Sequence, residues 1–207
     1  MLPGAHHVIN LSLTYFEGSD LIWIQDGLSK KKILMSQLEP AARRLARVLS
    51  SKGVGPGDVV TLVEDSLIQA PVLAIATWLC GGVFNTMDPY LHQTVVANSI
   101  HLSQPKLILT SAPFLWKVKD YCAKKNVLIW LNDQPGNFVH IVSSTEEDQE
   151  DKTASTPPGN NPNDLALILW TSGSTGFPKG IKLSFSALVK QCLRQWKAPL
   201  SNQKNSE

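Results

Sequence analysis

The feature that most constrains this chain is an apolar strand that leads directly into a loop of glycines, hydroxyl side chains and one lysine. Residues 164–170 read D-L-A-L-I-L-W, which predicts a strand buried in a parallel sheet. Residues 171–180 read T-S-G-S-T-G-F-P-K-G. Glycines allow successive backbone N–H groups to point into one concavity, and hydroxyls and an ammonium group add further donors. The composition therefore predicts a phosphate-binding loop.

Two common phosphate motifs do not fit this loop. The pattern G-x-x-x-x-G-K-[ST], counted from Gly173, needs glycine where Pro178 stands, and Lys179 is followed by Gly180 rather than by Ser or Thr. The pattern G-x-G-x-x-G is not met either. A plain surface loop with a solvated lysine is the alternative for a short Gly/Ser/Thr cluster. The whole ordered string is more specific and favours the phosphate site.

Helical and strand patterns alternate along the chain from residue 21, which predicts an α/β fold of layered βα units with a mostly parallel sheet. The first helix is expected to begin with a capping box of Ser36 and Glu39 and to end at Gly53. Further strands are predicted at 59–63, 83–86, 107–110 and 127–131, and further helices at 66–80, 95–102 and 113–124.

One change of composition divides the chain. Residues 143–163 are rich in Ser, Thr, Asp, Glu, Asn, Pro and Gly, and such a stretch is too polar to bury a core. We therefore expect an N-terminal α/β subdomain over 1–142 and an acidic, polar linker over 143–163. The start of a second subdomain with the phosphate loop is expected over 164–197, and a polar tail over 198–207.

Charge and cysteine content exclude several classes of function. Nineteen Lys and Arg against seventeen Asp and Glu give a formal charge of +2, so the chain has no basic excess that would favour nucleic acid. Cys80, Cys122 and Cys192 lie far apart without a C-x-x-C pair, which predicts reduced thiols and neither a zinc site nor a disulfide framework.

The sequence predicts neither a membrane span nor a targeting signal. The stretch without charges between Asp65 and Asp88 is interrupted by Gln, Pro and Gly, so we expect a buried helix there rather than a transmembrane segment. The N-terminal residues lack the basic and apolar regions of a secretory signal, and the chain does not end in a peroxisomal tripeptide. A cytoplasmic protein is the expectation.

The string from Trp170 to Gly180 closely resembles the signature loop of the adenylate-forming (AMP-binding) superfamily. This superfamily includes acyl-CoA synthetases, 4-coumarate–CoA ligases, beetle luciferases and the adenylation domains of peptide synthetases. Residues 45–60, with L-A-R-V-L and G-V-G-P-G-D-V-V, look like the early helix and turn of the family, and residues 81–89 look like its second core motif. The resemblance covers about residues 20–197.

The resemblance implies a two-step ligase. ATP and a carboxylic acid, with magnesium, give an acyl-adenylate and pyrophosphate, and the thiol of coenzyme A or of a carrier-protein pantetheine then takes the acyl group. Donors aimed at the leaving pyrophosphate lower the barrier, because negative charge concentrates there. By motif position, the residues that would hold the β- and γ-phosphates are Thr171, Ser172, Gly173, Ser174, Thr175, Gly176 and Lys179.

Two differences from the family limit the residue roles that the resemblance implies. The family often has a histidine shortly after the loop, where this chain has Leu183-Ser184-Phe185, so no role of that histidine is expected. The chain stops at Glu207, less than half the length of family members. The segments that bind adenine, ribose, magnesium and the acyl group, and the catalytic lysine of the small C-terminal domain, are therefore assigned to no residue here.

Three interpretations remain open. The first is the N-terminal part of an acid–thiol ligase, with 4-coumarate or fatty acyl-CoA ligases preferred over an amino-acid adenylation module. The second is a truncated, non-catalytic product of such a gene. The third is a generic phosphate-binding protein with no preference for ATP. A sheet interrupted after residues 165–170 would leave strand edges and a helix face with Leu183, Leu188 and Leu193 uncovered, which predicts poor solubility or dependence on a partner.

Overall fold

A computed structural model describes residues 22–25, 30, 32–65, 70–132, 161–171 and 178–197 of the 207-residue chain. The strands of the described residues are β1 (Ile22–Gln25), β2 (Lys32–Leu34), β3 (Val59–Val63), β4 (Val83–Met87), β5 (Leu107–Thr110), β6 (Leu128–Leu131), β7 (Leu165–Thr171) and β8 (Lys179–Ser184). The helices are α2 (Met35–Ser51), α3 (Ala70–Leu79), α4 (Gln93–Ser103), α5 (Ala112–Leu115), α6 (Lys119–Lys125) and α8 (Phe185–Lys197).

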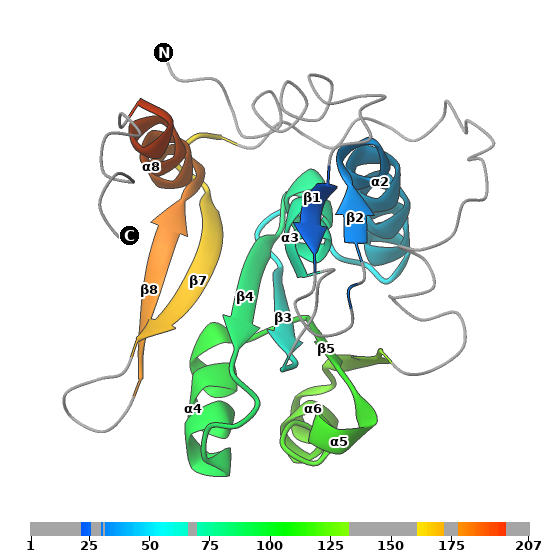
Figure 1. Ribbon diagram of the computed structural model, residues 1–207. Helices are drawn as coiled ribbons and strands as arrows, with labels where there is room; N and C mark the ends of the chain where they lie inside the picture. The colour runs from blue at the N-terminus through cyan, green and yellow to red at the C-terminus, as the bar shows by residue number, and fades with distance from the viewer. Residues whose placement is uncertain are drawn as a thin grey trace, which may run out of the picture.

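Six of these strands form one sheet in the order β6-β5-β3-β4-β7-β8. The neighbours from β6 to β7 are parallel, and β8 alone in this sheet runs antiparallel, as the second strand of a hairpin with β7 (Figure 1). The short strands β1 and β2 form a separate antiparallel pair beside α2. The predicted α/β architecture with a mostly parallel sheet is confirmed. Among the described residues, no helix is long and apolar enough to cross a bilayer.

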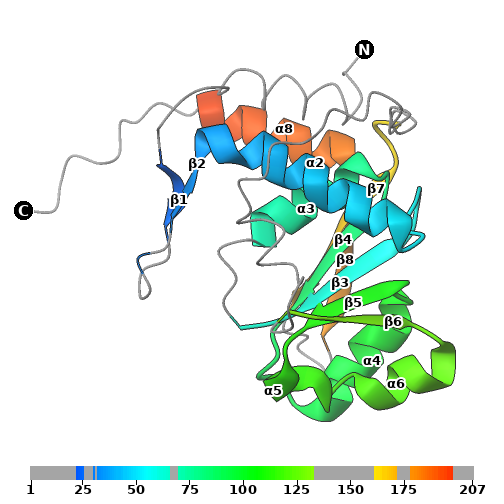
Figure 2. The same ribbon diagram turned by 90° about the vertical axis from the view of Figure 1, so that its right-hand side faces the viewer.

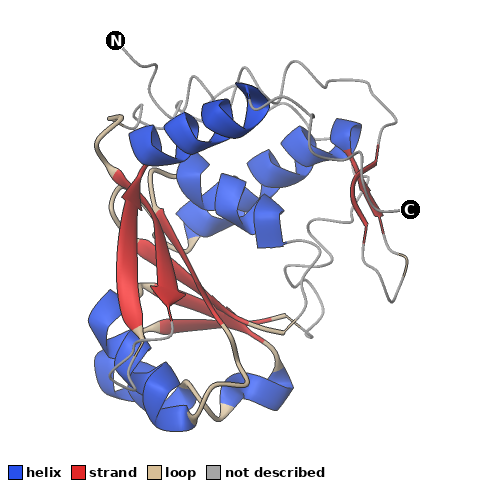
Figure 3. Ribbon diagram, turned by 60° about the vertical axis from the view of Figure 1, so that its left-hand side comes forward, coloured by secondary structure: helices blue, strands red, loops and turns tan. Residues whose placement is uncertain are grey.

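Helices cover both faces of the sheet (Figures 2 and 3). Helices α2 and α3 pack on one face in a cluster that includes Leu107 and Leu109 of β5, whereas Ile108 between them packs on the other face with α4 and α6. Side chains of a strand alternate between the two faces, so a strand covered on both sides is apolar throughout. This explains why residues 107–109 of β5 are all apolar and why the whole strand is buried.

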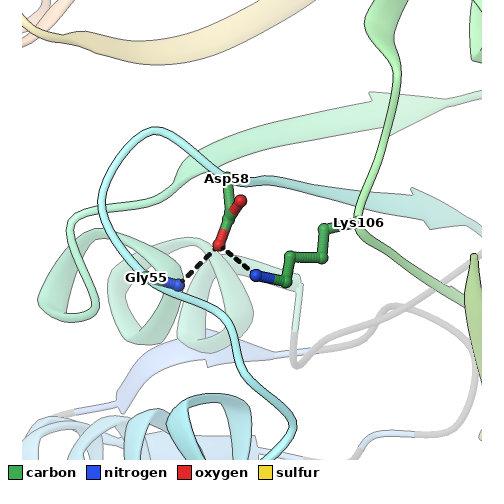
Figure 4. Close-up of polar contacts among 3 residues, drawn as sticks. All are labelled: Gly55, Asp58 and Lys106. Carbon is green, nitrogen blue, oxygen red and sulfur yellow. Dashed lines mark hydrogen bonds and ion pairs between the residues drawn. The ribbon is translucent and has the colours of Figure 1, made fainter.

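The turn before β3 is closed by one carboxylate. Asp58 Oδ2 accepts hydrogen bonds from Gly55 N and from Lys106 Nζ, both at 2.9 Å, and so ties the start of β3 to the residue before β5 (Figure 4). Gly82 lies against the same turn. A Cβ added there would stand 2.9 Å from the Asp58 carbonyl oxygen, so only glycine fits this approach.

The expected capping box of the first helix is wrong. Helix α2 begins at Met35, and its amino end is capped by the Gln37 side chain, whose Oε1 accepts from Leu34 N at 3.0 Å. The expected partner Glu39 instead pairs with Arg43 at i+4. The end at Gly53 is confirmed, because the helix stops at Ser51 and Gly53 has a positive φ of 82°.

The helix expected over 113–124 is two helices, α5 and α6. Tertiary contacts override the helical pattern between them: Val118 is fully buried, and Lys117 Nζ donates to the Leu91 carbonyl at 2.6 Å. The helix expected over 66–80 is observed from Ala70 to Leu79, and residues 66–69 lie outside the described part of the chain. Leu183, expected on a helix face, belongs to strand β8.

The three cysteines differ in accessibility, which gives a test of the packing. All three thiols are free; Cys80 and Cys122 are buried and Cys192 is exposed. Burial raises the pKa of the Cys122 thiol to about 11 and also raises that of Cys80, so both stay protonated and shielded near neutral pH. We expect iodoacetamide at pH 8 to label Cys192 alone in the native chain, counted by intact mass. Rapid labelling of Cys122 without denaturant would contradict the packing of α6.

Candidate functional site

The hairpin of β7 and β8 places Thr171 and Lys179, the described residues on either side of 172–177, at one edge of the sheet. Strand β7 is parallel to β4, so its last residue, Thr171, lies at the edge where β3, β4 and β5 also end. Figure 1 shows the two hairpin strands side by side, with their open ends toward α8. Ligands of open α/β sheets bind at the carboxyl ends of the parallel strands. The position therefore suits the site that the sequence predicts.

The structure describes two of the seven predicted phosphate ligands and brings these two together. Thr171 and Lys179 are register partners of the hairpin, and both are exposed. The Thr171 hydroxyl donates to the Lys179 carbonyl oxygen at 3.4 Å, so this hydroxyl would have to turn in order to donate to a phosphate. The other five predicted ligands, which lie outside the described residues, are Ser172, Gly173, Ser174, Thr175 and Gly176. The role of all seven as phosphate ligands stays a prediction.

The hairpin has two different faces near this edge. Leu169 pairs with Ile181 on the same face as Thr171 and Lys179, and these two apolar side chains remain 38% and 44% exposed. Successive residues of a strand point to opposite faces. Lys182, whose register partner is Ile168, therefore lies on the face opposite to Lys179.

Trp170 joins the end of β7 to the interior of the sheet. Its Nε1 donates to Asn85 Oδ1 at 2.8 Å, and Asn85 Nδ2 donates to Thr61 Oγ1 at 2.9 Å. Asn85 and Thr61 are register partners in β4 and β3, and both are completely buried. Sequence reasoning missed these two residues. The available signal was an amide side chain in the largely apolar strand V-F-N-T-M, since a buried amide needs hydrogen-bond partners.

The other end of β7 is held by a second tryptophan. Trp78 Nε1 of α3 donates to the Ala166 carbonyl oxygen at 2.7 Å, and the Trp78 ring packs edge-on against Phe185 with 6.0 Å between the ring centroids. Strand β7 is thus held near its two ends by side-chain hydrogen bonds, one with helix α3 and one with strand β4. Leu183 and Ser184, which stand where the family often has a histidine, close β8, and Phe185 starts α8.

Acidic side chains at this edge of the sheet take part in local contacts. Tyr90 Oη donates to Asp65 Oδ2 at 3.0 Å, and Tyr90 N donates to Asp88 Oδ1 at 2.8 Å. Burial is the main cause that raises the pKa of the Glu64 carboxyl, and a hydrogen bond with Ser111 opposes it. Within the described ranges, no group of three or more His, Cys, Asp or Glu side chains could hold a metal ion.

The chain matches known sequences over most of its length. The family model described as AMP-binding enzyme matches residues 24–206. The chain is 28% identical to 4-coumarate–CoA ligase 1 of Petroselinum crispum over 171 residues, which cover 82% of this chain and 31% of the ligase. It is 33% identical to tyrocidine synthase 2 of Brevibacillus parabrevis over 160 residues, which cover 77% of this chain and 4% of the synthase. The chain therefore spans less than a third of each of these two relatives.

Solved structures show the same fold. ATP-bound MatB from Rhodopseudomonas palustris superposes with a TM-score of 0.76 at 24% identity, over 92% of this chain and 37% of that protein. The luciferase-like enzyme from the nonluminescent Zophobas morio mealworm superposes with a TM-score of 0.77 at 19% identity, over 94% of this chain and 45% of that protein. At these identities the likeness concerns the fold alone.

Proposed function

The chain belongs to the AMP-binding enzyme family, and on that premise we propose that it is the N-terminal part of an ATP-dependent acid–thiol ligase. Such a ligase joins ATP and a carboxylic acid to an acyl-adenylate with release of pyrophosphate, and transfers the acyl group to coenzyme A or a pantetheine thiol. The observation that carries the proposal is the pairing of Thr171 with Lys179 at the carboxyl edge of the parallel sheet. The residues between them, 172–177, are rich in glycine and hydroxyl side chains.

The described residues suit phosphate binding by charge and by position. Lys179 offers an exposed ammonium group, a point charge for phosphate oxygens, and Thr171 offers a hydroxyl on the same face of the hairpin. In acyl transfer to AMP, negative charge collects on the departing pyrophosphate. Donors held at that place stabilise the transition state more than the bound substrate, because the charge to be stabilised is larger there.

Magnesium would accompany ATP in this function. Among the residues that the structure describes, no acidic cluster suited to a metal ion is found, so no side chain of this chain is assigned to it. The acid, the thiol acceptor and a cytoplasmic location likewise stay predictions.

A second candidate concerns the class of acid. The 33% identity with tyrocidine synthase 2 exceeds the 28% identity with 4-coumarate–CoA ligase 1, which favours part of an amino-acid adenylation module as the alternative. A non-catalytic product of a gene of this family, able to bind ATP without forming the adenylate, is the other alternative. All three share the phosphate site and differ in the chemistry after ATP binding.

Calorimetric titration of the chain with ATP, pyrophosphate and inorganic phosphate tests the shared site. We expect ATP to bind more tightly than inorganic phosphate, because the loop is proposed to hold two phosphates of one nucleotide. Binding of inorganic phosphate as tight as that of ATP would instead favour a general phosphate-binding protein. Exchange of labelled pyrophosphate into ATP, with 4-coumarate, a fatty acid or amino acids present, should be absent for the 207-residue chain. Exchange that depends on an added acid would contradict its assignment as a part of the ligase.

A further inference from the structure

The hydrogen bond from Trp170 to Asn85 lies where the backbone pairing between β4 and β7 ends. The register pairs of these strands are Phe84 with Leu167 and Asn85 with Ile168. Trp170 lies two residues beyond Ile168, toward the predicted phosphate loop, and its indole reaches back to Asn85. The side-chain contact therefore holds the part of β7 that extends past its backbone pairing with β4.

The same indole ring lies against the second strand of the hairpin. Gly180 is the register partner of Trp170, and a Cβ added at Gly180 would stand 3.2 Å from Cη2 and Cζ3 of the Trp170 ring. Because Gly180 has no side chain, the Trp170 ring can pack directly against its backbone. Thr171 and Lys179 are the immediate neighbours of Trp170 and Gly180 in the chain, so the ring position and the positions of these two residues are linked.

The side chains of Asn85 and Thr61, at the buried end of this hydrogen-bond chain, have little freedom to move. Asn85 and Thr61 are 0% exposed, and their side chains are hydrogen-bonded to each other. Asn85 is also hydrogen-bonded to Trp170. A buried amide that loses its partner loses a full hydrogen bond without compensation from water. The contact consequently favours one orientation of Trp170 over others.

We propose that Asn85 is a positioning residue that acts through Trp170 to hold Thr171 and Lys179 in place for the phosphates of ATP. The inference rests on the proposed function, because it assigns Asn85 to the same phosphate site. Asn85 itself is fully buried and is not expected to touch the ligand. Asn85 contributes by keeping the end of the hairpin in one position. Without this contact, the bound ligand would have to order the hairpin end, which costs binding free energy.

The test compares ATP affinity, by calorimetry, for the full chain and for Asn85→Leu, Trp170→Phe and the double variant. Asn85→Leu removes the acceptor at similar volume, and Trp170→Phe removes the indole N–H but keeps an aromatic ring. We expect each single variant to bind ATP about fivefold more weakly, the equivalent of one hydrogen bond. The double variant should be no weaker than the weaker single variant, because both changes remove the same bond.

A matched pair of threonine variants separates positioning from general loss of stability. Thr61 and Thr77 are both fully buried; Thr61 accepts from Asn85, whereas the Thr77 hydroxyl donates to the Leu73 carbonyl within α3 at 2.8 Å. Both Thr→Val variants should lower the free energy of unfolding. Thr61→Val is expected to weaken ATP binding and Thr77→Val to leave the affinity unchanged. Equal weakening by both would overturn the inference.

The indole N–H of Trp170 gives a spectroscopic signature of the contact. In ¹⁵N-labelled protein its signal is identified by its absence from Trp170→Phe. We expect slow exchange of this proton with solvent in the unmodified chain and in Thr77→Val, and faster exchange in Asn85→Leu. Slow exchange that survives in Asn85→Leu would contradict the inference.

The outcomes distinguish this inference from the proposed function. If the unmodified chain binds ATP and Lys179→Ala weakens the binding, but Asn85→Leu and Trp170→Phe bind as tightly as the unmodified chain, the inference fails and the proposed function stands. If the unmodified chain binds no ATP, both fail. Should Asn85→Leu not fold, Trp170→Phe and Thr61→Val decide the question.

Discussion

Lys179→Ala is expected to weaken ATP binding by about tenfold or more. The change removes an exposed ammonium group at the base of the predicted loop, and a hydrogen bond to a charged group contributes roughly 1.5 to 3 kcal/mol. Every 1.4 kcal/mol or so corresponds to about tenfold in affinity. Calorimetric titration of both chains with ATP at low ionic strength measures the effect, since salt screens an exposed charge.

Lys182→Ala is the matched control. Lys182 lies on the same exposed strand and carries the same charge, but its register partner is Ile168, so it lies on the other face of the hairpin. Removal of either lysine changes the net charge equally. We expect Lys182→Ala to alter ATP affinity much less than Lys179→Ala. Equal affinities of the unmodified chain and Lys179→Ala would rule out Lys179 as a phosphate ligand.

Leu73→Ala is expected to cause the largest loss of stability among single changes considered for this chain. Leu73 is fully buried in α3, within the cluster that joins α2, α3 and one face of the sheet. Truncation of a buried leucine removes its transfer free energy and leaves a cavity, and costs about 2 to 5 kcal/mol. Urea unfolding followed by circular dichroism measures this loss as a lower midpoint with an unchanged slope.

Leu102→Ala is the comparison for this effect. Leu102 is also helical, in α4, but it is 60% exposed. Changes at such surface positions usually alter stability by no more than about 0.5 kcal/mol. If Leu73→Ala and Leu102→Ala unfolded at the same urea concentration, the packing of α3 against the sheet would be wrong.

The exposed edge of the hairpin bears on how the chain behaves in solution. Strand β8 ends the six-stranded sheet, and its Ile181 forms an exposed apolar pair with Leu169 of β7. An uncovered edge strand next to apolar surface promotes association, which lysines on the strand, here Lys179 and Lys182, counteract. The predicted poor solubility or dependence on a partner stays a prediction.

The sequence by itself determined the elements whose signals are local. Strands β3 and β5 were predicted with the bounds that the structure shows, because short apolar runs between turn residues have few other stable conformations. The candidate phosphate loop is likewise predicted from the glycines, hydroxyls and Lys179 that follow β7, and its role stays a prediction. In β3 and β5 the residues that decide the conformation are neighbours in the chain.

Only the tertiary structure decided which distant residues meet. The strand order, the antiparallel direction of β8 and the contact of Trp170 with Asn85, 85 residues away, depend on how the elements pack together. The same holds for the cap of α2, where Gln37 and not Glu39 binds the helix end. Several local conformations have similar free energies, and long-range packing selects among them. The pattern of neighbouring residues therefore does not predict which one forms.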